Sequence, residues 1–395
     1  MRRVAVITAP NMAYKNPGMV TVDLAFEAVC RRLGPDVATS WYTLHPPELR
    51  PLRDYVRSRD LPFDFAPLGA HLAELEEHDA IVFWGDFQHA RHYLQQDATT
   101  RMLDLGPAAD RRSAQQLVTQ SLLLAGTPEH VLDRTVLYGG SILHNSQSDY
   151  ADEEYASPFR RLMSRCHAVW MRDPLSAAKA AHLRRGGAAH FGADCALLLR
   201  PGDLDFLPTT GWADAVEEGV GAVFLGARTP VPRWLPALSR ELARRLGVRL
   251  EWLPWLGASR EPGTPWIRQR GDDYSLGDLL AALSRYQIVI TDTYHLCVNA
   301  WRMGVPTVCI GSPTRRSPEY QTLDDLKKYV FYSSYEAEDF YLSTDPESVA
   351  QRMASLDRLL DLTAGDGARR IAIRMRQHAE QSLEALQDEL TTVLA

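Results

Sequence analysis

The stretch 288–311, with the sequence IVITDTYHLCVNAWRMGVPTVCIG, constrains the fold more than any other part of the chain. Two short apolar runs, at 288–290 and 307–310, have the length of buried strands. Between them apolar residues recur with helical spacing, and Gly304 and Pro306 end that helical pattern. The order of strand, helix and strand predicts a parallel unit with a right-handed crossover.

The turn after the first of these strands is the strongest candidate for a functional site. Thr291, Asp292 and Thr293 have N-cap chemistry, and we expect Asp292 to cap the helix that follows. Open α/β sheets bind ligands at the carboxyl ends of their strands, and helix N-termini favour anions. His295 lies in the first turn of this helix, so we expect its imidazole to transfer protons near neutral pH.

The rest of the chain alternates strands and helices on both sides of a segment rich in Pro and Gly. The other expected strands lie at 4–8, 37–44, 80–84, 136–138, 167–171, 221–225 and 248–253. A chain of 395 residues is too long for one ordinary core. We therefore expect an α/β protein with two Rossmann-like domains facing across a cleft, at 1–200 and 220–345, with a linker at 201–219 and C-terminal helices at 346–395.

Composition narrows the partners and the location of the protein. The net charge of -7 argues against a nucleic-acid-binding surface. Five cysteines without a CxxC pair indicate reduced thiols in a cytoplasmic protein, and no metal-binding spacing occurs. No run approaches the roughly 18 apolar residues of a membrane helix, so no integral membrane segment is expected. The first strand lacks a GxGxxG loop, and we expect no cofactor. The oligomeric state stays open.

Three segments resemble one family, the polysaccharide pyruvyl transferases. The segment VWMRDPLS at 169–176 resembles that family's Arg-Asp-x-x-Ser element after a strand. The segment FGADCALLL at 191–199 is similar to its short Asp-containing strand before the domain crossover, and 288–311 is similar to its strand–His–helix–Gly-x-Pro element. The resemblance extends over about residues 1–345 and implies a GT-B-like fold.

The resemblance also implies an activity. Family members transfer a pyruvyl (carboxyvinyl) unit from phosphoenolpyruvate onto a hydroxyl group of a sugar. We therefore expect phosphoenolpyruvate as donor and a carbohydrate or glycosylated small molecule as acceptor, in polysaccharide or secondary-metabolite biosynthesis. The domain at 1–200 would then be the acceptor side and the domain at 220–345 the donor side.

The same resemblance suggests roles for individual residues. Arg172, at a strand end, is expected to bind the carboxylate or phosphate of the donor, and His295 to protonate its methylene carbon or the leaving phosphate. Arg315 follows the next strand and would complete the anion clamp from the other domain, with Arg316 as its rival. The remaining candidates for substrate binding are the turn residues Thr293 and Arg228.

The chain departs from the family pattern in two places. Thr293 stands where many members have Arg, two residues before the His. Many members have a Gly-Gly pair after the third N-terminal strand, where this chain has Gly85-Asp86. The sequence 139–141, Gly-Gly-Ser, is compatible with a tight turn or with a small anion nest.

Two other functions stay open. A GT-B glycosyltransferase using a nucleotide sugar would need a carboxylate for the ribose on the helix after 288–293, and residues 299–303 contain none. A member of the family that binds without catalysis is the other alternative. Asp86 and Glu319 are both candidates for the base that activates the acceptor, and the sequence does not rank them.

Overall fold

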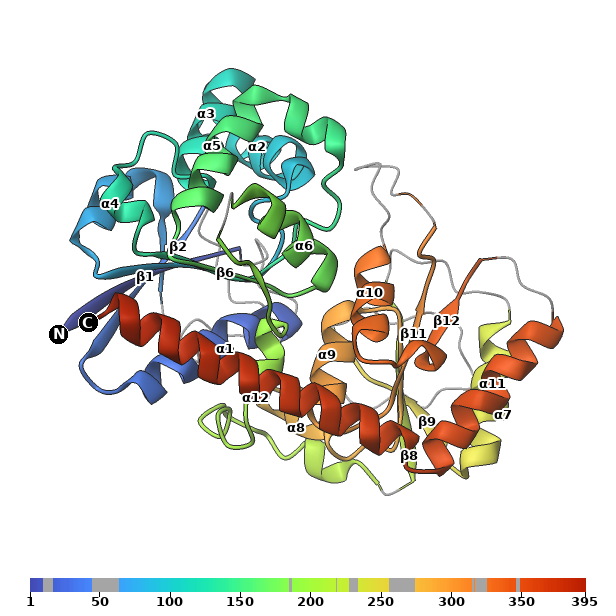
Figure 1. The fold of residues 1–395 in the computed structure, drawn as a ribbon. Coiled ribbons are helices and arrows are strands. Elements are labelled where there is room, and N and C mark those ends of the chain that lie inside the picture. The colour runs from blue at the N-terminus through green and yellow to red at the C-terminus, as the bar shows by residue number, and fades with distance from the viewer. Residues whose placement is uncertain are drawn as a thin grey trace.

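In a computed structural model the chain forms two lobes, each built around a parallel β-sheet (Figure 1). The structure describes residues 1–9, 17–44, 64–184, 187–217, 219–226, 234–255, 274–314, 316, 325–345 and 349–395. The first sheet has seven strands in the order β3-β2-β1-β4-β5-β6-β7, and the second has five in the order β12-β11-β10-β8-β9. The expected fold class, α/β with two Rossmann-like units, is confirmed.

The first lobe is built on the seven-stranded sheet and follows the predicted alternation of strands and helices. Its strands are β1 (Arg2–Thr8), β2 (Val37–Thr43), β3 (Phe65–Pro67), β4 (Ala80–Trp84), β5 (Thr135–Gly140), β6 (Ala168–Met171) and β7 (His190–Phe191). Its helices are α1 (Pro17–Leu33), α2 (Thr99–Asp104), α3 (Arg111–Leu122), α4 (Glu129–Leu132), α5 (Glu153–Arg165) and α6 (Pro174–Leu183), with a π-helix at Tyr93–Ala98.

The second lobe repeats the pattern on a smaller scale. Its strands are β8 (Val220–Phe224), β9 (Arg249–Trp252), β10 (Val289–Thr291), β11 (Thr307–Gly311) and β12 (Tyr341–Ser343). Its helices are α7 (Leu235–Leu246), α8 (Leu276–Leu283), α9 (Tyr294–Arg302) and α10 (Leu326–Ser334), and the chain ends in α11 (Val349–Ala364) and α12 (Gly367–Val393). The βαβ unit expected at 288–311 is β10-α9-β11, with β10 and β11 parallel and Val289 paired with Thr307.

The segment 191–199 differs from the expected strand. Strand β7 ends at Phe191, and Cys195–Leu198 forms a buried 3₁₀ turn instead. Asp194 opens this turn because its carboxylate accepts a hydrogen bond from the backbone N–H of Ala196 at 3.1 Å. The apolar run therefore packs against α1, α9 and α12 rather than extending the sheet.

Helix α12 connects the two lobes. It starts beside α11 in the second lobe and runs back along the first, as the red helix in Figure 1 shows. In the first lobe Glu389 of α12 pairs with His167 at 3.1 Å and accepts a hydrogen bond from the Trp170 indole at 3.3 Å. Ser382 accepts a hydrogen bond from the Ala193 N–H at 3.1 Å. These contacts hold the C-terminus of the chain on the first lobe.

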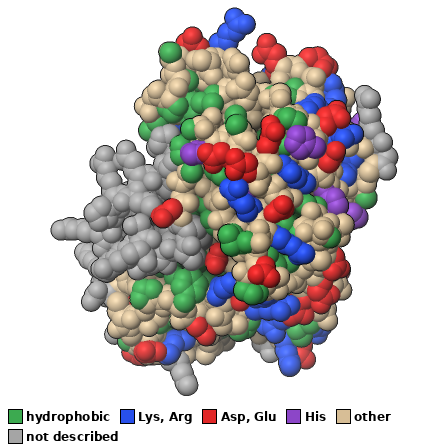
Figure 2. Space-filling view, turned by 90° about the vertical axis from the view of Figure 1, so that its left-hand side faces the viewer, with side chains coloured by type: hydrophobic (Ala, Val, Ile, Leu, Met, Phe, Trp, Pro, Cys, Tyr) green, Lys and Arg blue, Asp and Glu red, His purple; other side chains and the backbone are tan. Residues whose placement is uncertain are grey.

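The surface and the helices add two observations. On the face drawn in Figure 2, acidic and basic side chains are interspersed among the described residues, without one continuous patch of either sign. None of the helices in the described part of the chain has the length and apolar character needed to cross a membrane.

Candidate functional site

The carboxyl ends of β6 and β10 bring residues from both lobes into contact. Arg172 follows β6, is only 8% exposed, and places its Cζ 4.7 Å from the centre of the Phe87 ring. The same Cζ lies 5.2 Å from the ring centre of Tyr294, the first residue of α9. His295, the next residue, forms an edge contact with the Tyr294 ring. Arg172 and His295, both predicted from the sequence, therefore meet at the lobe junction.

The residues after Arg172 fix its position. The Asp173 carboxylate caps α6 by accepting a hydrogen bond from the Ser176 N–H at 2.7 Å. It also accepts hydrogen bonds from the hydroxyl groups of Ser176 and Ser141, at 2.7 and 2.8 Å. The Ser176 hydroxyl in turn accepts the N–H of Ile142. Asp173 and Ser176 thus have structural roles, because they fix the turn that holds the buried Arg172 side chain.

Asp194 joins the three segments that resemble the family. Its Oδ2 accepts a hydrogen bond from the Tyr294 hydroxyl at 3.0 Å and lies 3.6 Å from Nη1 of Arg172. The carboxylate is buried, with 2% exposure. The pair with Arg172 is longer than a hydrogen bond, so Asp194 holds the guanidinium without saturating its donors.

Lys327 is a functional candidate that the sequence did not indicate. It lies in the first turn of α10, with Nζ 5.4 Å from the Phe87 ring centre and 5.8 Å from that of Tyr294. Burial, and then the charge of Arg172, lower the pKa of Lys327 to about 8. Its ammonium has no hydrogen bond or ion pair to another described residue. The only sequence signal is rarity, because Lys327 is one of four lysines in the chain.

His295 is buried in the first turn of α9. Burial, and then the positive charges of Arg172 and Lys327, lower the pKa of His295 to about 3. This value differs from the expectation of titration near neutrality, because the sequence reveals neither the burial nor the two cations. The ring is therefore uncharged at neutral pH, and its Nδ1 is buried with no partner among the described residues.

A hydrogen-bonded link fixes the helix that carries His295. The Asn299 side-chain amide donates to the His295 carbonyl at 2.8 Å and to the Thr21 hydroxyl of α1 at 3.0 Å. Both polar side chains are fully buried. Helix α9 of the second lobe is thereby held against α1 of the first.

Asp86 follows β4 in an unusual backbone conformation. Gly85 and Asp86 both have positive φ, 71° and 56°, and the Asp86 carbonyl accepts the Ser141 N–H at 2.8 Å. That bond uses the Ser141 N–H group that an anion nest at 139–141 would need. Gly139 and Gly140 are the last residues of β5, where the pairing with β6 shifts its register, so this segment is a strand end rather than a nest or a tight turn. Asp86 stands where many family members have the second Gly of a pair, and it adopts the left-handed conformation that glycine takes readily.

Asp292 does not cap α9, contrary to the expectation. The N-cap residue is Thr293, without a side-chain capping bond, and the Asp292 carboxylate accepts the Gly226 N–H at 2.5 Å instead. The reason is the sheet order: β8 lies directly beside β10, so the turn after β8 competes for the carboxylate. The Thr293 hydroxyl also donates to Asp292, at 3.3 Å.

The remaining candidates from the sequence are placed as follows. Arg316 is exposed. Thr293 is half-buried at the start of α9. Three further candidates lie outside the described residues: Arg315, Arg228 and Glu319.

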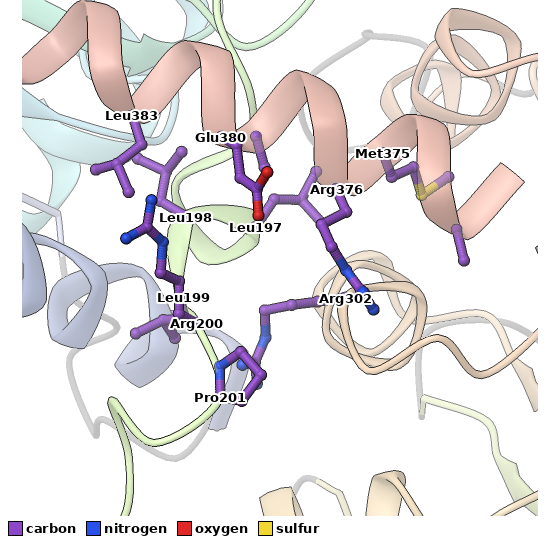
Figure 3. A pocket seen from close by; sticks show the side chains of 12 residues that line it. Leu197, Leu198, Leu199, Arg200, Pro201, Arg302, Met375, Arg376, Glu380 and Leu383 are labelled. Atoms are coloured by element: carbon purple, nitrogen blue, oxygen red, sulfur yellow. The ribbon is translucent and has the colours of Figure 1, made fainter.

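A separate cavity of about 60 Å³ lies between residues 197–201 and α12 (Figure 3). Leucine, alanine and methionine side chains form most of its wall, while Arg302 enters from α9 and Glu380 from α12. Neither Arg172 nor His295 lines it. A volume of this size holds only a few water molecules, so the cavity reflects packing between helices rather than a substrate site.

Solved structures similar to the chain show the class of fold. The glycosyltransferase of kitacinnamycin matches with TM-score 0.52 and 13% identity, over 100% of this chain and 99% of that one. Staphylococcus aureus MnaA, solved with UDP, matches with TM-score 0.52 and 9% identity, over 99% and 97%. UDP-GlcNAc 2-epimerase from Neisseria meningitidis matches with TM-score 0.51 and 11% identity, over 98% and 100%. The protein thus has a GT-B-like α/β fold.

The family follows from the sequence itself. The model of the polysaccharide pyruvyl transferase family matches residues 24–313, and the chain belongs to this family of transferases. A search of curated proteins found no match. The matched range includes Arg172, Asp194 and His295 but ends before Lys327.

Proposed function

We propose that the protein transfers a pyruvyl unit from phosphoenolpyruvate to a hydroxyl group of a sugar or sugar-like acceptor. The observation that carries this proposal is the position of Arg172 and Lys327. They come from different lobes, lie over the same two aromatic rings, and hold no hydrogen-bonded carboxylate among the described residues. Two such cations beside a histidine favour a small substrate with two anionic groups.

Phosphoenolpyruvate has a carboxylate and a phosphate on a three-carbon skeleton. A guanidinium binds either group through two parallel hydrogen bonds, and an ammonium binds a phosphate as a point charge. Each charge-assisted bond contributes roughly 1.5–3 kcal/mol. Arg172 and Lys327 therefore supply the anion site in this proposal, and Arg315 stays proposed as a third cation from the same lobe as Lys327.

His295 acts as an acid only when the donor is bound. In the empty site burial, and then the charges of Arg172 and Lys327, oppose protonation of the ring. The negative charges of phosphoenolpyruvate offset both cations and raise the pKa of His295, so that the ring takes up a proton together with the substrate. Because donor binding and protonation of His295 are coupled, the protonated ring lies beside phosphoenolpyruvate when the reaction begins.

The reaction balances as an addition followed by loss of phosphate. His295 gives its proton to C3 of phosphoenolpyruvate, which becomes a methyl group, while the acceptor oxygen bonds to C2 and loses its own proton. The bond between C2 and the phosphate oxygen then breaks, and phosphate leaves with the electron pair. A second hydroxyl of the acceptor bonds to C2 and gives up its proton, which closes the ketal. In this proposal Arg172 and Lys327 stabilise the charge on the leaving phosphate.

A nucleotide-sugar donor has less support. In an open α/β sheet the diphosphate binds at the switch point of the strand order, which lies between β8 and β10 in the second lobe. There the Asp292 carboxylate already accepts a hydrogen bond from the Gly226 N–H, which a bound phosphate would need as a donor. A diphosphate would have to displace this buried carboxylate or bind beside its negative charge.

A thermal-unfolding panel tests the proposed donor. A ligand at a hundred times its Kd stabilises the folded state by about 2.7 kcal/mol. We expect phosphoenolpyruvate to raise the Tm, and UDP-glucose to leave it unchanged. The reverse result would favour the glycosyltransferase alternative. With an acceptor in hand, His295→Gln should lower the rate of phosphate release by about 10²–10⁴-fold while the fold survives.

A further inference from the structure

We propose that the acceptor binds on the first lobe between Asp86 and His144, that it is an uncharged polyol, and that Asp86 is the base that takes the proton of its attacking hydroxyl. This inference rests on the proposed function, because it assigns the second substrate of the same reaction.

The first support is the position of Asp86. Asp86 follows β4, which lies beside β1 in the first sheet. The strand order reverses between these two strands, and open α/β sheets bind ligands at such a point. Its carboxylate is half-buried and makes no hydrogen bond or ion pair with another residue in the described part of the chain. Its negative charge contributes to the raised pKa of Arg172 and partly opposes the lowering of the pKa of Lys327 and His295, so it lies near all three.

The backbone at Asp86 adds a second support. A φ of 56° disfavours residues with a side chain, although Asp and Asn tolerate it better than most. Strained positions of this kind persist where the surrounding structure holds them, and they cluster at active sites. Here the Asp86 carbonyl is held by the Ser141 N–H, which fixes the direction in which the carboxylate leaves the chain.

The wall next to Asp86 is aromatic and uncharged. The His144 and His92 rings lie 5.5 and 5.8 Å from the Phe87 ring, and 5.2 Å from each other. Burial, and for His144 also the charge of His92, lowers the pKa of His92 to about 4 and that of His144 to about 3. The π-helix Tyr93–Ala98 begins directly after His92, and π-helical turns are frequent at functional sites.

These surroundings select the class of acceptor. An aromatic face with neutral imidazoles packs against the C–H face of a sugar and exchanges hydrogen bonds with its hydroxyl groups. A phosphorylated acceptor would compete with the donor for Arg172 and Lys327, and would face the Asp86 carboxylate. An uncharged diol avoids both costs and brings one hydroxyl to Asp86, which accepts its proton as the oxygen bonds to C2 of the donor.

The test uses the full chain with phosphoenolpyruvate and methyl glucoside, methyl galactoside and methyl mannoside as probes. Saturation-transfer NMR detects binding of the glycosides, and phosphate release detects transfer. Asn tolerates the positive φ, so Asp86→Asn removes the charge without changing the backbone. Glu336→Gln is the matched control, since Glu336 is an acidic residue at φ 54° outside the site.

We expect at least one glycoside to bind to the native protein with phosphoenolpyruvate present. Asp86→Asn should keep phosphoenolpyruvate binding but lower phosphate release at least about 100-fold, and His144→Ala should weaken glycoside binding about tenfold or more. Glu336→Gln should behave as the native protein does.

The outcomes separate this inference from the proposed function. The acceptor class is overturned if the native protein binds phosphoenolpyruvate but none of the glycosides. It is also overturned if the native protein binds glucose 1-phosphate in place of the glycosides. Phosphate release by Asp86→Asn at the native rate overturns the role of Asp86. Native protein that binds no phosphoenolpyruvate overturns the proposed function, and this inference with it.

Discussion

Arg172 and Lys327 lie over the same pair of aromatic rings, although they come from different lobes. Arg172 is 4.7 Å from the centre of Phe87 and 5.2 Å from that of Tyr294, and the corresponding distances for Lys327 are 5.4 and 5.8 Å. Burial, and then repulsion by the charge of Arg172, lower the pKa of Lys327 to about 8. An anion between the two cations would offset that repulsion, and we propose that the pair forms an anion site assembled from both lobes.

The first prediction concerns Lys327. Lys327→Met keeps the length of the side chain and removes its charge, so the Kd for phosphoenolpyruvate should rise about 10–100-fold. The variant should be no less stable than the native protein, because the charge it removes is partly buried and has no carboxylate partner among the described residues. Calorimetry and urea unfolding measure the two effects.

Two control variants sharpen that measurement. Lys327→Arg keeps the charge and should retain most of the affinity. Arg285→Met removes an exposed charge from the surface of the same lobe and should leave binding unchanged. A native Kd in Lys327→Met would exclude this residue from the anion site.

The second prediction concerns pH and stability. The pKa of His295 is lowered from 6.5 to about 3 in the folded protein. Between pH 6.5 and 3 the His295 ring is protonated in the unfolded chain but not in the folded protein. The contribution of the neutral ring to the unfolding free energy is therefore fully present above about pH 6.5 and is lost as the pH falls towards 3. One such histidine changes the unfolding free energy by up to about 1.4 kcal/mol per pH unit.

Other histidines whose pKa is lowered by loss of hydration share this dependence: His89, which is buried, and His92 and His144, which are half-buried. His295→Gln should therefore flatten the slope of unfolding free energy between pH 6 and 4 by about one proton without abolishing it. Urea unfolding over a pH series gives the slope. An unchanged slope would mean that His295 is not buried as a neutral ring.

The third prediction separates the two roles of Tyr294. Tyr294→Phe deletes the hydroxyl that donates to Asp194 but keeps the ring beside Arg172 and Lys327. We expect a loss of about 1–3 kcal/mol in stability with a Kd for phosphoenolpyruvate within about threefold of native. Tyr294→Leu also removes the ring and should weaken binding further. Equal binding by the Phe and Leu variants would show that the ring does not help to place the cations.

Much of the fold was predictable because strands and helices here have clear boundaries. The apolar run at 80–84 predicts a strand with the bounds of β4, Ala80–Trp84, and the pattern at 288–311 predicts the unit β10-α9-β11. Strands β3 and β12 were missed, since each has three residues and forms through pairing at a sheet edge. The division into domains at 1–200 and 220–345 stays a proposal.

The site was predictable where a motif carries it. Arg172 and His295 each follow a strand in a segment that resembles the family, so their convergence at the strand ends could be anticipated. Lys327 belongs to no such segment, and only the packing of α10 against the lobe junction brings its ammonium near Phe87. Likewise, the low pKa of His295 and the bond between Asp292 and Gly226 depend on neighbours that are distant in sequence.

Calorimetric titration of phosphoenolpyruvate tests the central claim most directly. Measurements on the native protein and on Arg172→Lys are compared, because an ammonium cannot reproduce the two parallel hydrogen bonds of a guanidinium. Arg160→Lys, at a half-buried residue of α5 outside the site, is the control. The account predicts saturable binding to the native protein and to the control, and a Kd at least about tenfold higher for Arg172→Lys. No binding to the native protein, or native affinity in Arg172→Lys, would contradict it.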